Sequence, residues 1–483
     1  MANDLRSVFM ETLGCARNDV DSEELAARLI LDGWVLTDSA DNADAVVVNT
    51  CGFVDVAKKD SIDAILAASE FKSGPDGPVV VAVGCLAERY GSELAETLPE
   101  ADAVLGFDDY ADIGARLRSI LAGEQHVPHA PRDRRQLLPI APVDRTVATI
   151  SLPGHGQTDA IPGWSPPVLR TRLDGSPVAP VKLASGCDRR CTFCAIPSFR
   201  GSFISRPPTD ILAEIAWLVE EGVREVVLVS ENSTSYGKDL GDLRLLESLL
   251  PAIGEGTTIA RARVAYLQPA EVRPGLLQVM ADTAVIAPYY DISFQHASPT
   301  VLRRMRRFGG IEEFCDLIDT IRTLDPAAGI RSNVIVGFPG ESDEDFMILR
   351  NFLERAQLDA IGVFGYSDEE GTEAFTFADK VPQEVVDARV REITALAEEL
   401  MAQRAEDRID STVEILVETV ENVDGEWVAT GRAGHQGPDD AECIITVART
   451  SLEQAPVVGS MVVARVVGCE GLDLLTQLVV ESE

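Results

Sequence analysis

Three cysteines lie close together in the run CDRRCTFC, at Cys187, Cys191 and Cys194 of the 483-residue chain. Their spacing is C-x3-C-x2-C. A structural zinc site needs four ligands, usually in two pairs, and no second Cys or His pair follows here. Ferredoxin-type clusters use C-x2-C-x2-C runs with a further cysteine, which is a different spacing. Three thiolates without a fourth would hold three irons of a [4Fe–4S] cluster and leave one iron open. The alternative, three structural thiols, is disfavoured because the arginines between them make a poor core.

A second set of three cysteines lies within the first 125 residues, each just after a short apolar run. They are Cys15, Cys51 and Cys85, separated by 36 and 34 residues, which suits one strand–helix–strand step each. If the strands are parallel, all three thiols meet at one carboxyl edge, where open α/β sheets bind ligands. We therefore expect a second iron–sulfur site there. The alternative is that cysteine serves as a small apolar residue at strand ends. The expected strands are Val8–Leu13, Ala45–Val48 and Val79–Val83.

Strands and helices alternate again from residue 181 to about 408, with the cysteine loop after the first strand. Six such β/α units predict an open, partial (β/α)6 barrel of the TIM type, whose site lies at the carboxyl ends of its strands. Expected helices include Thr209–Glu221 and Ile311–Leu324. The expected strands are Val181–Ala184, Val226–Ser230, Ala262–Tyr266, Tyr290–Phe294, Ser332–Val336 and Gly362–Phe364.

Polar residues and glycines at these strand ends are candidate site residues. Glu231 ends the second strand and would hold hydroxyl or amino groups, and Gln295 and His296 end the fourth. A single histidine at a strand end is more often structural. Gly337 and Gly340, in the turn VGFPGE, would allow the backbone to approach an adenosine closely. The basic run Arg303–Arg307 is read first as a solvated helix face, with steering of an acidic group as the alternative.

The sequence as a whole predicts four regions. Residues 1–125 form an open α/β domain, 126–180 a proline-rich linker or insert, 181–408 the barrel and 409–483 a small all-β barrel. Three histidines lie in the insert, but a metal site there is disfavoured by its irregular setting. A long helix is expected after Pro382. Strands are expected at Thr412–Glu418, Glu426–Thr430 and Met461–Val467.

The chain is strongly acidic, with a formal net charge of −37. This charge disfavours direct binding of nucleic acid or of an anionic membrane, and it suits a basic partner. The first ten residues lack the layout of a signal peptide, and no apolar run approaches 18 residues. We therefore expect a cytoplasmic protein with no membrane contact, whose thiols serve metal binding before disulfides.

These residues resemble the methylthiotransferases of the radical S-adenosylmethionine (SAM) superfamily. That family combines an N-terminal domain with three cysteines, a radical SAM barrel and a C-terminal TRAM domain. The resemblance covers nearly the whole chain apart from the proline-rich segment. The motifs that carry it are ETLGCARNDVDSE, VVNTCGFVDVAKKDSI, VAVGCLAERYGSEL, SGCDRRCTFCAIPSFRGSFISRP, DISFQHASPTVLRRMRRFGG, NVIVGFPGESDEDF and ATGRAGHQGPDD.

The resemblance implies two [4Fe–4S] clusters and SAM as cofactors. Cys187, Cys191 and Cys194 would be the catalytic set, holding the cluster that cleaves SAM, with Phe193 and the Gly337–Gly340 turn near the adenosine. The strand-end cysteines of the first domain would hold the auxiliary cluster. One electron would convert SAM to methionine and a 5′-deoxyadenosyl radical that removes hydrogen from an unactivated C–H bond. The auxiliary cluster would then present a methylated sulfur to the carbon radical.

The family has two branches, and the sequence favours one of them. One branch modifies adenosines in transfer RNA, and the other modifies an aspartate at its β-carbon in protein twelve of the small ribosomal subunit. The runs IPSFRG and SFQHASPTVLRRMRRFG resemble the second branch. The segment 410–483 carries 14 acidic residues and three arginines, a net charge of −11, which would repel RNA and attract a basic protein.

Two other functions are kept as alternatives. A transfer RNA methylthiotransferase is the first, and an iron–sulfur electron carrier without SAM chemistry is the second. The favoured enzyme would also need an electron donor, such as a reductase with flavodoxin or ferredoxin.

Overall fold

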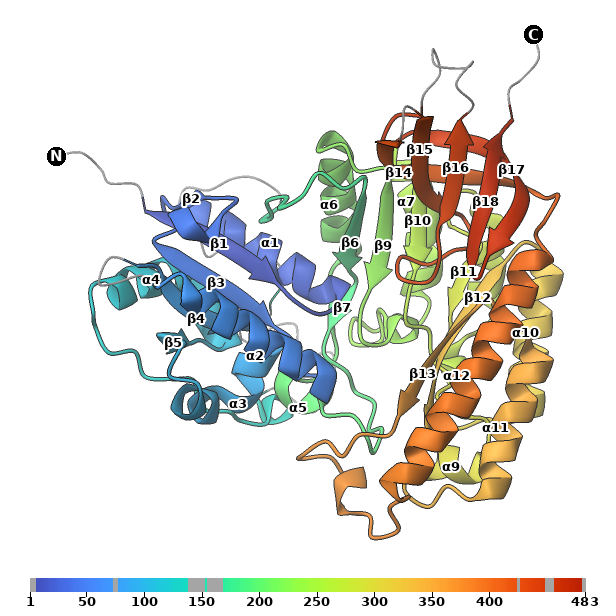
Figure 1. Cartoon of the computed structure of the whole chain (residues 1–483), viewed down its shortest axis with the longest axis horizontal. Helices are drawn as coiled ribbons and strands as arrows, with labels where there is room; N and C mark the ends of the chain where they lie inside the picture. Colours follow the sequence, from blue (N-terminus) through green and yellow to red (C-terminus); the bar gives the residue numbers. More distant parts are fainter. Residues whose placement is uncertain are drawn as a thin grey trace.

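The computed structural model describes residues 6–72, 77–137, 153, 168–423, 426–447 and 456–479. An α/β domain at the N-terminus stands beside a half-open barrel, and a small β-barrel at the C-terminus caps one end of it (Figure 1). In the described part of the chain, none of the helices has the length and apolar composition needed to cross a lipid bilayer.

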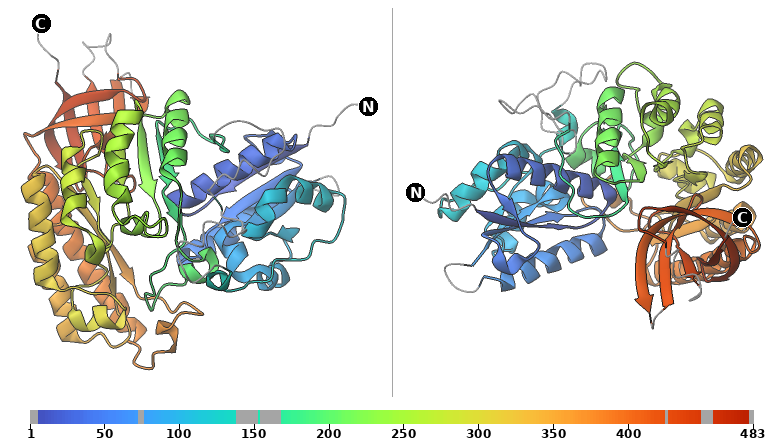
Figure 2. Two further views of the ribbon diagram at one scale, coloured as in Figure 1. Left: turned by 180° about the vertical axis from the view of Figure 1, so that it is seen from behind. Right: turned by 90° about the horizontal axis from the view of Figure 1, so that it is seen from above.

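The N-terminal domain is a parallel five-stranded sheet in the order β2-β1-β3-β4-β5. Alternate side chains of β3 lie on opposite faces of the sheet, where Val47 packs with α1 and α4, and Val46 packs with α2 and α3. Helices cover both faces of this sheet (Figure 2). This alternation is the period of two that a strand buried on both faces shows. The elements are β1 Ser7–Thr12, α1 Ala16–Leu31, β2 Val35–Leu36, β3 Ala45–Thr50, α2 Asp55–Glu70, β4 Val79–Val83, α3 Gly84–Thr97, β5 Ala103–Val104 and α4 Ile113–Leu121.

The central domain contains two parallel three-stranded sheets, β6-β9-β10 and β11-β12-β13. Parallel bridges such as Leu267 to Ile292 join them between β10 and β11. The result is a curved six-stranded sheet with helices outside it. Its elements are β6 Val178–Lys182, α6 Pro208–Glu220, β9 Glu225–Val229, α7 Leu245–Gly256, β10 Arg261–Val264, α8 Pro274–Asp282, β11 Tyr289–Asp291, α9 Pro299–Arg304, α10 Ile311–Leu324, β12 Gly329–Val336, α11 Asp343–Ala356, β13 Ala360–Gly365 and α12 Gln383–Glu406.

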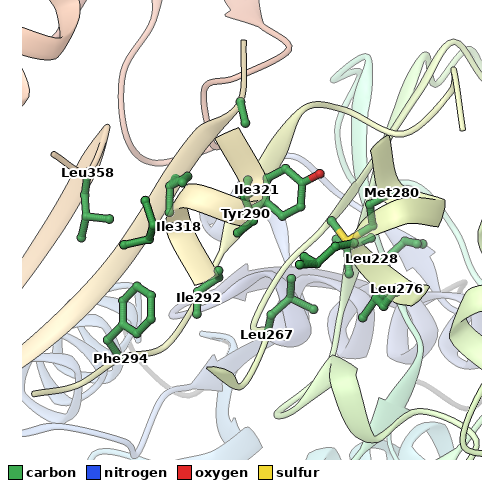
Figure 3. Close-up of a cluster of buried hydrophobic side chains, with 14 of the residues drawn as sticks. Leu228, Leu267, Leu276, Met280, Tyr290, Ile292, Phe294, Ile318, Ile321 and Leu358 are labelled. Atoms are coloured by element: carbon green, nitrogen blue, oxygen red, sulfur yellow. The ribbon is translucent and has the colours of Figure 1, made fainter. Parts of the chain in front are cut away.

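The core of this domain lies between the sheet and its helices. Leu228 and Leu267 from the sheet region, with Ile318 from α10, are each fully buried there (Figure 3). Phe294 stacks edge-on against Phe352, with ring centroids 5.3 Å apart. This packing fixes the strands whose carboxyl ends carry the site.

The C-terminal domain is a closed barrel in the strand order β14-β15-β16-β18-β17. Antiparallel pairing of β14 with β17 closes it. Its strands are β14 Thr412–Val423, β15 Glu426–Ala433, β16 Cys443–Val447, β17 Met461–Glu470 and β18 Asp473–Leu478. The domain is joined to the central domain around Glu225 of β9, which pairs with Arg263 and approaches Arg432 of β15 at 3.6 Å.

The fold class predicted from the sequence is confirmed: an open α/β domain, a partial barrel and a small β-barrel. Strand β4 and helix α10 have the bounds that the sequence predicted, while β16 and β18 were not predicted. The first barrel strand begins at Val178, inside the segment read as a linker, and contains Pro180. Proline is tolerated there because β6 is the edge strand of its sheet, where a missing N–H breaks no ladder bond.

Parts of the proline-rich segment are packed against the N-terminal domain. Arg134, in a short 3-10 helix, is 1% exposed and lies 3.0 Å from the carboxylate of Glu88. His129 lies 3.4 Å from the same carboxylate. The third histidine of the segment, His155, lies outside the described residues.

Candidate active site

The cysteine loop of the central domain follows the two-residue strand β7, Ala184–Ser185, and ends at helix α5, Ile196–Arg200. Three backbone hydrogen bonds hold it at two residues: Cys187 donates to Gly201 at 3.0 Å, while Thr192 donates to Met305 and accepts from Ala374. The three thiols are therefore carried on a loop that is fixed at its first cysteine and in its middle.

Burial governs the protonation of Cys187 and Cys194. Burial raises the pKa of Cys194 to about 12, and the neighbouring Cys191 sulfur adds to the rise. Burial likewise raises the pKa of Cys187, with Cys194 adding to it. Thiols of this kind become thiolates when a metal supplies positive charge, so the donor set fits an iron cluster. No group of Cys, His, Asp and Glu in the described residues is arranged around a single point as ligands of one ion would be. The thiolates that hold a polynuclear cluster lie farther apart than the ligands of a single ion, since each thiolate binds a different iron.

The three cysteines of the N-terminal domain converge at one edge of its sheet. Cys15 precedes α1, Cys51 follows β3, and Cys85 is the second residue of α3. A Cβ at Gly14 would lie 2.8 Å from the Cβ of Cys51, so the first two loops touch. A Cβ at Gly52 would lie 3.0 Å from the carbonyl oxygen of Cys85, so the second and third loops touch as well. The glycines beside the cysteines are thus required for the convergence of the three loops.

Two arginines lower the cost of thiolates in this second trio. Burial raises the pKa of Cys15, but the charges of Arg17 and Arg200 and the Arg17 hydrogen bond outweigh it, so that the pKa is lowered. Burial raises the pKa of Cys85 to about 11, although Arg200 opposes the rise. The pKa of Cys51 is raised by burial. The trio therefore contains one thiol that ionises more readily than an ordinary cysteine, beside two that ionise less readily.

Each of these arginines crosses from its own domain to the other. Arg17, on α1, donates from Nη1 to the carbonyl oxygen of Ser230 at the end of β9, at 3.3 Å. Arg200, at the end of α5, donates from Nη2 to the sulfur of Cys85 at 3.1 Å and to Asp21 at 3.0 Å. The neighbouring Phe199 packs into the core of the N-terminal domain. The two cysteine trios therefore face one interface, and both arginines belong to it.

A layer of buried charge continues this interface along α1. Asp21 forms an ion pair with Lys182 of β6, and the two side chains are 1% and 0% exposed. Arg170 pairs with Glu23 of α1 and with Glu214 of α6, the latter at 2.5 Å. Sequence reasoning missed Asp21, Glu23 and Glu214 because charged positions on an amphipathic helix are read as solvent-facing.

Glu231 lies in the same interface, at the predicted strand end. Its side chain is 3% exposed, and Oε1 is 3.9 Å from Arg17 and 4.0 Å from Arg200. Neither oxygen accepts a hydrogen bond from the described residues. Buried carboxylate oxygens normally have partners, so Glu231 fits a ligand that donates, such as an amino group.

The other predicted cofactor residues have mixed surroundings. Phe193 is half-buried and packs edge-on against Phe338, with ring centroids 6.5 Å apart. Gln295 adopts a φ of +69°, which is rare outside glycine and is typical of residues near functional sites. Protein atoms occupy the room that the glycines leave: Val386 stands 2.5 Å from a Cβ built at Gly337, and Asp379 stands 2.7 Å from one at Gly340. Their role toward an adenosine stays a prediction.

The basic run after the fourth strand is at least partly exposed to solvent at Arg303, Arg304 and Arg306, as the first reading expected, and is buried at Arg307. Arg304 pairs with Asp379 at 2.6 Å, and Arg306 pairs with Glu373 at 2.6 Å. Arg307 is 5% exposed and lies 3.6 Å from the sulfur of Cys191. His296 is fully buried, and its Nδ1 accepts a hydrogen bond from the Ser298 backbone, which is the structural role that the sequence favoured.

Comparison with known proteins agrees with this geometry. Residues 181–353 match the Radical SAM superfamily, and residues 7–106 match a family described as uncharacterized protein family UPF0004. The chain is 60% identical to the ribosomal protein uS12 methylthiotransferase RimO of Streptomyces coelicolor, over 98% of this chain and 96% of the relative. It is 58% identical to the protein of that name from Kineococcus radiotolerans, over 99% and 98%.

The chain belongs to the RimO family of methylthiotransferases. As a member of that family it is a radical SAM transferase, a class that uses SAM with a [4Fe–4S] cluster. The resemblance seen in its motifs is therefore confirmed. A solved structure with a similar fold is the radical SAM methyltransferase TsrM from Kitasatospora setae, with a TM-score of 0.52 and 13% identity, over 75% of this chain and 72% of that one.

Proposed function

We propose that this protein attaches a methylthio group to the β-carbon of an aspartate in ribosomal protein uS12. The observation that carries the proposal is the pair of cysteine trios on one buried interface, each on a domain of its own. Relatives 55–60% identical over nearly the whole chain bear the name uS12 methylthiotransferase. Two thiol sets on facing domains suit a reaction that needs a hydrogen-abstracting centre and a sulfur donor at the same carbon.

Cys187, Cys191 and Cys194 would hold the cluster at which SAM is cleaved. Cys15, Cys51 and Cys85 would hold a second, auxiliary [4Fe–4S] cluster. When bound, these groups supply an electron to SAM, a radical able to remove hydrogen from an unactivated carbon, and the sulfur to be inserted. Their electron would come from a reductase with flavodoxin or ferredoxin.

The chain's own residues prepare the site for these groups. Arg17 and Arg200 place positive charge beside the thiolates of the auxiliary trio, which favours anionic ligands in a buried setting. Glu231 would accept a hydrogen bond from the amino group of SAM. The side chains of Asp21 and Lys182 are 1% and 0% exposed, so the interface is closed to solvent at this pair. Exclusion of water protects a carbon radical from side reactions.

The charge of the C-terminal barrel favours a protein substrate over transfer RNA. Arg432 is buried against Glu418 and Glu225, and Arg465 pairs with Asp410. An RNA-binding surface would need cations free to neutralise phosphates. A basic ribosomal protein suits an acidic surface, and direct nucleic-acid binding is not expected.

Mass spectrometry of uS12 and of digested RNA, from a strain that lacks this gene, tests the proposal. Loss of the methylthio group from the aspartate, with methylthioadenosine unchanged, is the expected result. Loss of methylthioadenosine instead would identify a transfer RNA enzyme. Anaerobic reconstitution tests the third candidate, because an electron carrier would make no 5′-deoxyadenosine from SAM under reducing conditions.

A further inference from the structure

The side chain of Arg17 lies between the two cysteine trios. Its Nε donates to the sulfur of Cys15 at 3.4 Å, and its Nη1 donates to the carbonyl oxygen of Ser230 on the barrel side. Its Nε also lies 3.9 Å from the carboxylate of Glu231, the residue after Ser230. Arg17 is thus a cation that contacts both the N-terminal trio and the carboxyl end of β9 in the barrel.

The guanidinium is held in place without using all of its donors. It lies over the ring of Tyr266, 5.2 Å from the ring centroid. Tyr266 has a φ of +61°, a conformation that side-chain-bearing residues seldom adopt, and it stands just past the end of β10. Among the described residues, the second terminal nitrogen, Nη2, has no hydrogen-bond partner. This nitrogen is not among the unpartnered nitrogens that the protein encloses completely, and the Arg17 side chain as a whole is 15% exposed.

The other buried cations near the trios are enclosed by protein. Arg200 is bonded to Asp21 and Cys85 through Nη2 and packs over the ring of Phe107, and its Nη1, which has no hydrogen-bond partner among the described residues, is closed off from solvent. Lys182 is enclosed with Asp21. Arg307 donates to a backbone carbonyl and approaches Cys191. Arg17 therefore combines a position between the trios with a donor that remains free.

The proposed reaction needs a cation at this place. The reacting carbon must reach both the hydrogen-abstracting centre and the sulfur donor, so it must lie between the trios. That carbon carries a carboxylate, and the surrounding thiolates and Glu231 are all anionic. A carboxylate entering such a site requires a positive partner, and arginine is the side chain best suited to a carboxylate.

Building on the proposed function, we propose that Arg17 binds the carboxylate of the target aspartate through its free Nη2. The contact orients the β-carbon between the two trios. It also selects aspartate over asparagine, because a neutral amide cannot replace the charge-assisted hydrogen bond.

Peptide binding to the reconstituted protein without reductant tests this assignment, since no turnover then occurs. The probes are a fluorescein-labelled uS12 peptide that contains the target aspartate and the same peptide with asparagine in its place. Wild-type protein should bind the aspartate peptide about 10- to 100-fold more tightly by fluorescence anisotropy. Arg17→Met should bind both peptides equally and weakly, and Arg17→Lys should keep part of the preference.

Arg89→Met is the matched control. Arg89 is a buried arginine of the same domain that contacts Glu369 of the barrel at 2.8 Å, so its loss weakens the domain interface without removing charge between the trios. This variant should keep the aspartate preference. Iron content and melting temperature identify any variant that has failed to fold, and Arg17→Lys then provides the comparison.

The outcomes separate this inference from the proposed function. If wild-type protein modifies the aspartate peptide and Arg17→Met keeps the aspartate preference, the assignment of Arg17 is wrong and the function stands. If Arg17→Met instead loses formation of 5′-deoxyadenosine in the absence of peptide, Arg17 serves SAM and the assignment is again wrong. If wild-type protein modifies transfer RNA and ignores both peptides, the proposed function fails, and the inference fails with it.

Discussion

Arg200 donates a hydrogen bond to the sulfur of Cys85 across the interface between the two domains, at 3.1 Å. Arg200 follows Cys194 by only six residues, so the segment that carries one trio also supplies a cation to the other. The contact is buried, since Arg200 is 6% exposed and Cys85 is 7% exposed. A charge so close to a thiolate stabilises whichever state of a bound cluster is more negative.

Replacing Arg200 should therefore change the electrochemistry of the auxiliary cluster. In a protein whose central-domain trio is changed to alanine, Arg200→Met should shift the reduction potential to more negative values, because the reduced cluster loses a cationic donor. A redox titration followed by electron paramagnetic resonance measures the shift. Arg206→Met is the control, because Arg206 is equally buried but pairs with Glu214. An unchanged potential would show that the hydrogen bond does not reach the cluster.

Substitutions in one trio at a time should separate SAM cleavage from sulfur insertion. Cys187→Ala should abolish formation of 5′-deoxyadenosine. Cys15→Ala and Cys85→Ala should keep that activity, lose sulfur insertion and lose about half of the iron. Chromatography of the nucleoside and mass analysis of the peptide measure the two products. Sulfur insertion by Cys15→Ala would contradict the auxiliary site.

The convergence of the N-terminal cysteines could be predicted from the sequence because the positions of strand ends in a parallel sheet follow a simple geometric rule. Parallel strands place their carboxyl ends on one edge, so Cys15, Cys51 and Cys85 were expected to meet, and they do. Arg17 and Glu23 could not be predicted in the same way. Both lie on α1, and a helix in an α/β layer is expected to expose its charged face. That face is covered here by a second domain, which no local pattern records.

Glu225 should be essential for attachment of the C-terminal barrel. It is fully buried and pairs with Arg261 at 3.2 Å and Arg263 at 2.6 Å, and Arg432 lies near it. Glu225→Gln should lower the free energy of unfolding by about 3–5 kcal/mol, because the buried arginines lose their common counter-charge. Glu414→Gln is the control: that carboxylate is 63% exposed and lies 3.8 Å from Arg261, so its loss should cost under about 1 kcal/mol. Equal losses in urea unfolding would contradict the prediction.

His129 should make stability depend on pH. The neighbouring Glu88 carboxylate raises the pKa of His129 above its ordinary value. A raised pKa in the folded protein means that the charged histidine stabilises the fold at low pH, and that this contribution is lost as pH rises through the folded pKa. The melting temperature of wild type minus that of His129→Gln should therefore be largest below about pH 6 and shrink toward pH 8. Calorimetry measures this difference, and a constant difference would contradict the ion pair.

Glu369 should couple the two centres by holding the domains together. Its carboxylate is 6% exposed and pairs with Lys58 of α2 at 2.7 Å and with Arg89 of α3 at 2.8 Å, while Glu369 itself lies in the loop after β13 (Figure 1). Glu369→Gln leaves both cations with a weaker partner and should loosen the N-terminal domain against the barrel. Because SAM cleavage needs only the barrel trio, 5′-deoxyadenosine should still form. Sulfur insertion requires the two trios to be held in a fixed relative position. The amount of methylthiolated peptide formed per 5′-deoxyadenosine should therefore fall about tenfold or more.

A matched control distinguishes loss of coupling from simple loss of charge at this position. Asp55 pairs with the same Lys58 at 3.0 Å but is 75% exposed, so Asp55→Asn should leave the ratio of the two products unchanged. Hydrogen exchange should quicken more at the start of α2 in Glu369→Gln than in Asp55→Asn, since Glu369 makes two buried ion pairs across the interface, whereas the exposed Asp55 reaches the barrel only by a hydrogen bond from Ser367 at 3.2 Å. If Glu369→Gln keeps the wild-type product ratio while hydrogen exchange at α2 quickens, the two trios keep their relative position without this ion pair. In that case the buried layer around Asp21 and Lys182, which joins α1 to β6, would hold the domains without the Glu369 contact.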